Sequence, residues 1–159
     1  MAPHPKQAAR RSATCESGAT LVEAAVGLTV LLMMVVGVMQ MALALYTYHY
    51  TSHAAREGTR YAIVRGSSSC ATLTTPCNVN SAAIQSYLRG LPTPGIKSSL
   101  ISVTATWPST LNCTPSATPC NNPTNLVKVT VTYPFPFAAP FITSATVNLS
   151  STSEMVISQ

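Results

Sequence analysis

The sequence predicts an α+β protein in which a long N-terminal transmembrane helix packs on a small antiparallel β-sheet of about three strands, stapled by disulfides. Three observations predict this class: an apolar run with the length of a membrane span, period-two hydrophobic patterns in the C-terminal half, and two equally spaced cysteine pairs. We expect a basic leader at 1–18, an extended helix at 19–66 and an extracytoplasmic domain at 67–159.

Composition excludes several classes of function. Only 8% of the 159 residues are charged, against about 25% in average soluble proteins. All four acidic residues are glutamates, so a Ser/His/Asp catalytic set is impossible, and no glycine-rich phosphate loop occurs. The net charge of +5 comes from scattered basic residues, which argues against nucleic-acid binding. We therefore expect no enzyme activity, no catalytic residues, no cofactor and no nucleic-acid partner.

The apolar run extends from Ala24 to Leu45 and contains neither charge nor proline. As a helix its 22 residues measure about 33 Å, close to the hydrocarbon core of a bilayer and longer than the apolar part of a cleaved secretory signal. Lys6, Arg10 and Arg11 precede it, and such basic flanks are retained in the cytoplasm. We expect a single-pass protein of the bacterial cytoplasmic membrane with its C-terminal domain outside.

This topology separates the five cysteines by compartment. Cys15 falls on the reducing side, and the other four fall where disulfides persist. Their spacing favours two local staples, Cys70 with Cys77 and Cys113 with Cys120, although sequence alone allows three connectivities. The alternative is a zinc site, which normally has cysteines only about two to four residues apart, so we expect no metal.

The helix is expected to continue beyond the membrane to Arg65, because no proline interrupts it before Gly66 and the serines that follow. Tyrosines at 46, 48 and 50 lie where the aromatic belt of a membrane protein is found. His49, His53 and Glu57 stand four residues apart on one face. That spacing allows a metal site or, as we favour, an ordinary polar helix face.

Beyond the first cysteine pair the pattern predicts a short helix and then strands. Residues 80–90 form the helix, with Asn80 or Ser81 as its N-cap and Gly90 at its end. Apolar residues then alternate with polar ones in three segments, which predicts half-buried strands. These segments are 101–107, 127–133 and 143–149, with Pro134, Pro136 and Pro140 forming a bend, Trp107 in the core, and the helix face at Ala55, Thr59 and Ala62 covering the sheet.

At the cytoplasmic end of the apolar run, a glycine precedes a single carboxylate by five residues. The segment reads Ser-Gly-Ala-Thr-Leu-Val-Glu from Ser17 to Glu23. An acid at the edge of a membrane helix costs about 1–3 kcal/mol unless it finds a partner. The basic leader, Gly18, Glu23 and the apolar helix together resemble the processing site of type IV pilin-like proteins. The resemblance implies that a prepilin peptidase cuts between Gly18 and Ala19, and that Glu23 neutralises the new amino group of its own or a neighbouring subunit.

A second block, Ala-Ala-Arg-Glu-Gly-Thr-Arg-Tyr-Ala from Ala54 to Ala62, is similar to TadE-like proteins, the pseudopilins of the tight-adherence (Tad) pilus. Residues 129–135 also resemble this family, whereas Ala24 stands where the family usually has an aromatic residue. The resemblance implies a minor pilin or assembly component of a Tad (Flp-type) pilus. Its partners would be the lipid bilayer, other pilin or pseudopilin subunits, the assembly platform and the prepilin peptidase. The alternative is an uncleaved single-span protein with an extracytoplasmic binding domain.

Overall fold

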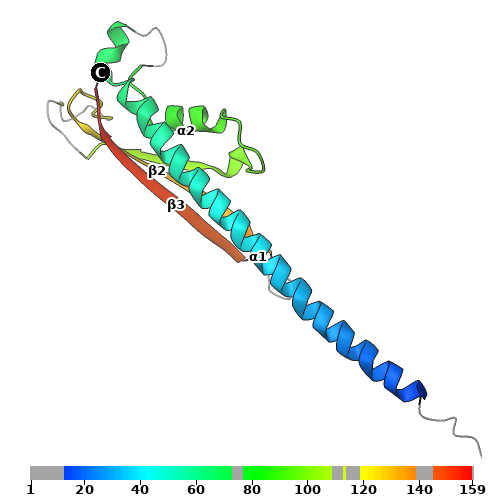
Figure 1. Ribbon diagram of the computed structural model, residues 1–159. Coiled ribbons are helices and arrows are strands. Elements are labelled where there is room, and N and C mark those ends of the chain that lie inside the picture. The colour runs from blue at the N-terminus through cyan, green and yellow to red at the C-terminus, as the bar shows by residue number, and fades with distance from the viewer. Residues whose placement is uncertain (1–12, 73–76, 109–112, 114–118, 139–144, 159) are drawn as a thin grey trace, which may run out of the picture. The chain divides into compact units, whose positions relative to one another are not determined.

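The computed structural model describes residues 13–72, 77–108, 113, 119–138 and 145–158, with side chains from Gly18 onwards (Figure 1). It confirms the α+β class, the long apolar helix and the three-stranded antiparallel sheet. The chain forms two compact units, one ending at Met39 and one from Gln40 to Gln159, here called the folded unit. The elements are α1 (Ala13–Ile63), the 3-10 helix η1 (Ser67–Ala71), α2 (Ser81–Arg89), the 3-10 helix η2 (Ser98–Leu100), β1 (Ser102–Thr106), β2 (Leu126–Phe137) and β3 (Ala145–Val156).

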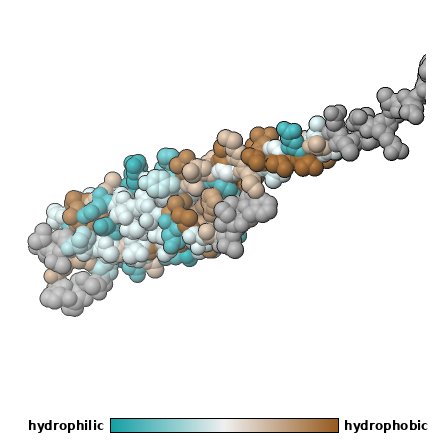
Figure 2. Space-filling model, turned by 90° about the horizontal axis from the view of Figure 1, so that it is seen from below, coloured by the Kyte–Doolittle hydropathy of each residue, from teal (hydrophilic) through white to brown (hydrophobic). Residues whose placement is uncertain are grey.

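Ahead of the folded unit, α1 presents apolar side chains on all sides. Every large apolar residue from Leu21 to Val35 is exposed, and Figure 2 shows a mostly apolar surface there. By length and composition, this is a helix that can cross a membrane. A helix that is apolar all round needs an apolar surrounding, which lipid supplies. The structure therefore fits a membrane-anchored protein.

Within the folded unit, α1 packs on the sheet through its smallest residues. Ala54, Ala55 and Thr59 are at most 1% exposed, and Ala62 also belongs to the core. A Cβ atom added to Gly58 would lie 3.2–3.3 Å from side-chain atoms of α2 and β2. The helix therefore approaches its neighbours as closely as a bare backbone allows. The helix face that the sequence assigns to the sheet is confirmed.

The sheet has the order β1-β2-β3 with both neighbouring pairs antiparallel. Alternate residues of the central strand, Val127, Val129 and Val131, are fully buried in one core with residues of α1 and α2. Side chains between them, such as Lys128, point to the opposite face, where hydroxyl groups predominate. On that face Thr130 Oγ1 lies 2.9 Å from the Oγ1 atom of Thr152 on β3.

Helix α2 covers the free edge of β1. Ser81 Oγ accepts a hydrogen bond from the backbone nitrogen of Ala105 and donates one to its carbonyl, both at 3.1 Å. Arg89 Nη2 donates to the carbonyl of Ile101 at 2.9 Å. Successive residues of a strand direct their backbone groups to opposite edges. Since the backbone groups of Ala105 point to α2, those of the even-numbered residues of β1 point to β2. The even-numbered residues of β2 therefore face β1.

This alternation explains where the bend prediction was wrong. Pro134 and Pro136 lie inside β2, opposite Asn148 and Thr146 of β3. Both are even-numbered and face the β1 side, but β1 pairs with β2 only as far as Thr132. Their missing N–H groups therefore cost no hydrogen bond of the sheet, as at an edge strand. Pro140, the third proline of the predicted bend, lies outside the described residues.

The third strand continues well beyond its predicted end, because β3 runs to Val156. Thr143, at the start of the predicted segment, lies outside the described residues. Past Leu149, the half-buried positions of β3 include Ser151 and Ser153, so the apolar alternation that marks a strand is absent. Thr59 Oγ1 of α1 reaches the Ser153 carbonyl at 3.4 Å, which shows how near the helix lies to these serines.

We predict that Gly58→Val lowers the stability of the folded unit by about 1–3 kcal/mol, because the added carbons overlap α2 and β2. Thermal unfolding of the full chain in detergent, followed by fluorescence of the half-buried Trp107, measures the change. Arg56→Val is the matched control, since it adds a β-branched residue at an exposed position of the same helix. An equal loss in both variants would contradict the close approach at Gly58.

Candidate assembly and anchoring site

The residues of the predicted processing site lie on the first turns of α1. Gly18, Ala19 and Glu23 are all helical and exposed, and no atom lies within 4 Å of a Cβ added to Gly18. Within the part of the chain whose side chains are described, the Glu23 carboxylate forms no hydrogen bond and no ion pair. Ala19 and Glu23 stand four residues apart, so they share one helix face. The basic residues of the leader and the side chain of Cys15 lie outside the described part.

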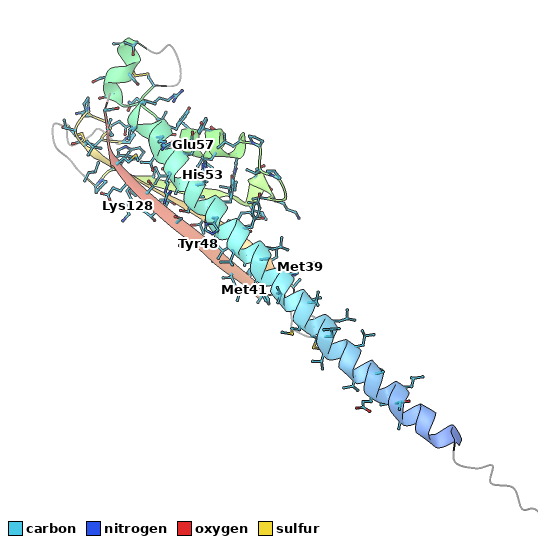
Figure 3. The ribbon with its side chains drawn as sticks, in the orientation of Figure 1. Met39, Met41, Tyr48, His53, Glu57 and Lys128 are labelled. Carbon is cyan, nitrogen blue, oxygen red and sulfur yellow. A yellow bond between two sulfur atoms is a disulfide. The ribbon has the colours of Figure 1, made fainter. Side chains whose placement is uncertain are left out.

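The second predicted block, at 54–62, joins α1 to α2. Tyr87 of α2 donates a hydrogen bond from its hydroxyl to Glu57 Oε1 at 3.1 Å. The Tyr87 ring stacks on Tyr61 with centroids 4.1 Å apart, and the Arg65 guanidinium lies 4.0 Å from the Tyr61 ring centroid. Glu57 and the exposed His53 are marked in Figure 3. The alanines of this block pack into the core, and Glu57 and Tyr61 contact α2.

Glu57 therefore has a structural partner, and the described residues hold no group of three His, Cys, Asp or Glu side chains placed to bind a metal. Burial, followed by the hydrogen bond to Glu57, raises the pKa of the Tyr87 phenol above its ordinary value. The neutral phenol is thus the form that the fold favours.

The three tyrosines of the predicted aromatic belt differ in their surroundings. The hydroxyl of Tyr46 donates to the carbonyl of Pro94 at 3.0 Å, which ties the loop between α2 and β1 to α1. Tyr50 is half-buried, and burial raises its pKa. Tyr48 is 48% exposed. One tyrosine thus fastens a loop, one belongs to the edge of the core and one faces outward.

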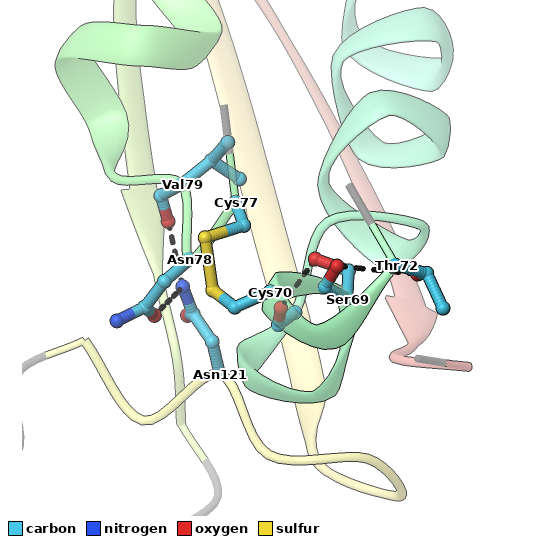
Figure 4. The surroundings of a disulfide bond; sticks show 8 residues. Ser69, Cys70, Thr72, Cys77, Asn78, Val79 and Asn121 are labelled. Carbon is cyan, nitrogen blue, oxygen red and sulfur yellow. Dashed lines mark hydrogen bonds between the residues drawn. A yellow bond between two sulfur atoms is a disulfide. The ribbon is translucent and has the colours of Figure 1, made fainter. Parts of the chain in front are cut away.

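The far end of the folded unit is closed by the two disulfides. Cys70 is bonded to Cys77, and Cys113 is bonded to Cys120, so each staple closes its own loop. Asn121, which follows the second staple, connects it to the first (Figure 4). Its side-chain Nδ2 donates to Asn78 Oδ1 at 2.9 Å and to the carbonyl of Val79 at 2.7 Å. Its backbone carbonyl accepts from the backbone nitrogen of Ser67 at 2.9 Å.

The model of the TadE-like protein family matches residues 18–60. This segment is TadE-like. The match confirms the resemblance carried by Gly18, Glu23 and most of the second block, and it covers α1 from the predicted processing site to Arg60. No curated protein and no solved structure matches the chain. The TadE-like segment, on a helix able to span a bilayer, indicates a membrane protein associated with a Tad pilus system.

Sequence reasoning missed two members of this site, Tyr87 and Arg65. Tyr87 belongs to the short second helix, outside the TadE-like segment, and Arg65 follows the end of α1. A single tyrosine on an amphipathic helix carries no signal of which residue it will contact. The stacking could be found only once α2 was placed beside α1.

We predict that Tyr87→Phe costs about 1 kcal/mol of stability at neutral pH, because the ring stack remains while the hydrogen bond to Glu57 is lost. The raised pKa means that the parent chain gains stability from the neutral phenol below pH 10 and loses it as the pH rises through the folded-state pKa. Chemical denaturation at several pH values measures both effects. Tyr48→Phe, at an exposed ring, is the control, and an alkaline loss in Tyr87→Phe as steep as in the parent would contradict this assignment.

Proposed function

We propose that the protein is a TadE-like pseudopilin or minor pilin, a structural or assembly component of a bacterial Tad (Flp-type) pilus. The observation that carries the proposal is the coincidence of the TadE-like segment with α1, whose first part exposes apolar side chains all round. A helix of this kind is stable in lipid and equally stable among other apolar helices, since the two surroundings are similar solvents. Its work is packing against other subunits and requires no catalytic group.

In this proposal, Glu23 fixes how the helices of neighbouring subunits are aligned along their length. A carboxylate on an apolar helix favours a position beside a positive charge. After cleavage between Gly18 and Ala19, the new amino group would lie one helical turn, about 6 Å, from Glu23 of the same chain, and a neighbouring subunit could supply an equivalent amine. Pairing between subunits would fix how far one helix slides along the next.

Cleavage requires the helix to unwind locally, because the peptide bond after Gly18 lies within α1. Glycine weakens a helix by about 1 kcal/mol relative to alanine, and terminal turns fray most readily. Gly18 is close to the start of α1, and no described atom outside its own stretch of helix lies near enough to hold it against unwinding. These properties suit a processing site on the cytoplasmic side.

The alternative function is an uncleaved single-span membrane protein whose extracytoplasmic domain binds a ligand or partner. It shares the anchor and the folded unit with the leading proposal. It differs in giving Gly18 and Glu23 no role, so these two residues decide between the proposals.

We predict that Glu23→Ala inserts into the membrane as well as the parent chain but fails to assemble with other subunits. Removing the carboxylate eases insertion and deletes the partner of the amine. Carbonate-resistant membrane association measures insertion, and cross-linking to pilus subunits measures assembly. Glu154→Ala, which removes an exposed carboxylate from β3, is the control. Unimpaired assembly of the Glu23 variant would show that the pairing does not occur.

We also predict a mature N-terminus at Ala19 that depends on a prepilin peptidase. N-terminal sequencing of the membrane-bound chain, with and without the peptidase, gives the answer directly. A Gly18→Leu variant should remain uncut, because its side chain obstructs the peptidase. An unprocessed start in both samples would favour the uncleaved membrane protein.

A further inference from the structure

The sheet of the folded unit extends alongside α1 as far as the last residues of the apolar run. Ala44, the residue before the end of that run, packs on the core, and Gln40 is already half-buried. Thr59 contacts Ser153, so the two elements can be aligned from this point. From Ser153 back to Ala145, β3 covers about 26 Å, which corresponds to roughly 17 residues of helix. Ala145 is thus about level with Ala42, and Figure 3 shows the lower end of β3 beside Met41.

The end of the β2–β3 pair that reaches this level is uncharged. The sequence has no charged residue from 129 to 153, while Lys128 and Glu154 face each other at the other end of the pairing. The described surface near the lower end is uncharged, with Val147 49% exposed, Phe137 half-buried and Ala145 exposed beside the polar Thr146 and Asn148. Such a surface can leave bulk water without desolvating a charge.

The loop between α2 and β1 is held at a similar level. Tyr46, the first residue after the apolar run, bonds to Pro94 of this loop. Lys97 follows on the same loop and is exposed, whereas Ile96 beside it is buried. A cation close to the outer limit of an apolar run lies where it can meet lipid phosphates.

We propose that the lower end of the β2–β3 pair, formed by Pro136–Phe137 and Ala145–Val147, lies in the interfacial layer of the bilayer beside α1. By the same alignment, Val147 is about level with Tyr46, just past the end of the apolar run, where an interfacial layer about 5–7 Å thick begins. Ala145 lies about 6 Å deeper, beside the upper acyl chains. The occupant of this surface is lipid, namely the headgroup and upper acyl region on the side of the folded unit. The folded unit then touches the membrane at two places, through α1 and through the sheet.

This inference rests on the membrane anchoring in the proposed function, and the experiment separates the two. Cys15→Ser removes the fifth cysteine, which belongs to neither disulfide, and single cysteines at Val147, Val156 or Val30 then take an environment-sensitive fluorophore. Val147 and Val156 are a matched pair, because both lie on β3 and are 49% and 54% exposed. Val30 reports on the membrane span. The chain is reconstituted into phosphatidylcholine–phosphatidylglycerol vesicles with and without nitroxide-labelled lipid.

The proposal expects strong quenching at Val30, quenching at Val147 several-fold greater than at Val156, and a blue-shifted emission at Val147. Quenching at Val30 with equal, weak quenching at both β3 sites would overturn the inference and leave the anchor intact. Absence of quenching at Val30 would overturn the anchor and the inference together.

A second pair of variants tests the same contact by placing a charge on one contact residue while the label stays on another. With the fluorophore on Ala145→Cys, Val147→Glu should abolish most of the quenching, because a carboxylate is costly to bury in the interfacial layer. Val156→Glu should leave it unchanged, and the unshifted fluorescence of Trp107 shows that both variants remain folded. Unchanged quenching in Val147→Glu would overturn the proposal.

Discussion

The close approach of α1 to the sheet at Gly58 is the constraint on which the rest of the folded unit depends. So close an approach requires small residues on one face of the helix, and the second block supplies them at Ala54, Ala55 and Ala62. The opposite demand applies ahead of Gln40, where α1 needs bulky apolar residues to match lipid. One continuous helix therefore has two different surroundings, lipid for its first part and the protein core for its second. Its side chains change from large to small between these two parts.

A small folded unit buries few apolar residues, so other interactions must stabilise its ends. Helix α2 bonds through Ser81 to Ala105 of β1 and through Arg89 to Ile101 just before it, and the ring stack of Tyr61 with Tyr87 holds α2 on α1. At the far end the two disulfides shorten the loops, and Asn121 connects them. These hydrogen bonds, the ring stack and the disulfides add stability that a larger domain would obtain by burying more apolar residues.

The sequence predicted the features that arise from local pattern. The apolar run, the helix capped by Asn80 and the alternation in β1 and β2 could all be read directly, and the amide of Ala83 does donate to Asn80 Oδ1. It failed where a neighbour decides the outcome. Pro134 and Pro136 lie in a strand because β1 ends before them, and the serines of β3 lie in a strand because they pair with β2. Gly18 and Glu23 carried the family resemblance, whereas the partners of the second block depend on the placement of α2.

We expect the second part of α1 and the sheet to form one cooperative structure, although α1 also continues into the apolar run. Native-state hydrogen exchange of the full chain in lipid nanodiscs, at increasing denaturant concentration, tests it most directly. Amides from Thr51 to Ala62 and amides of β2 should open with the same free energy and the same denaturant dependence. Exchange of the α1 amides at a clearly lower free energy than β2 would contradict it, because the helix would then be only a membrane anchor laid against an independently folded sheet.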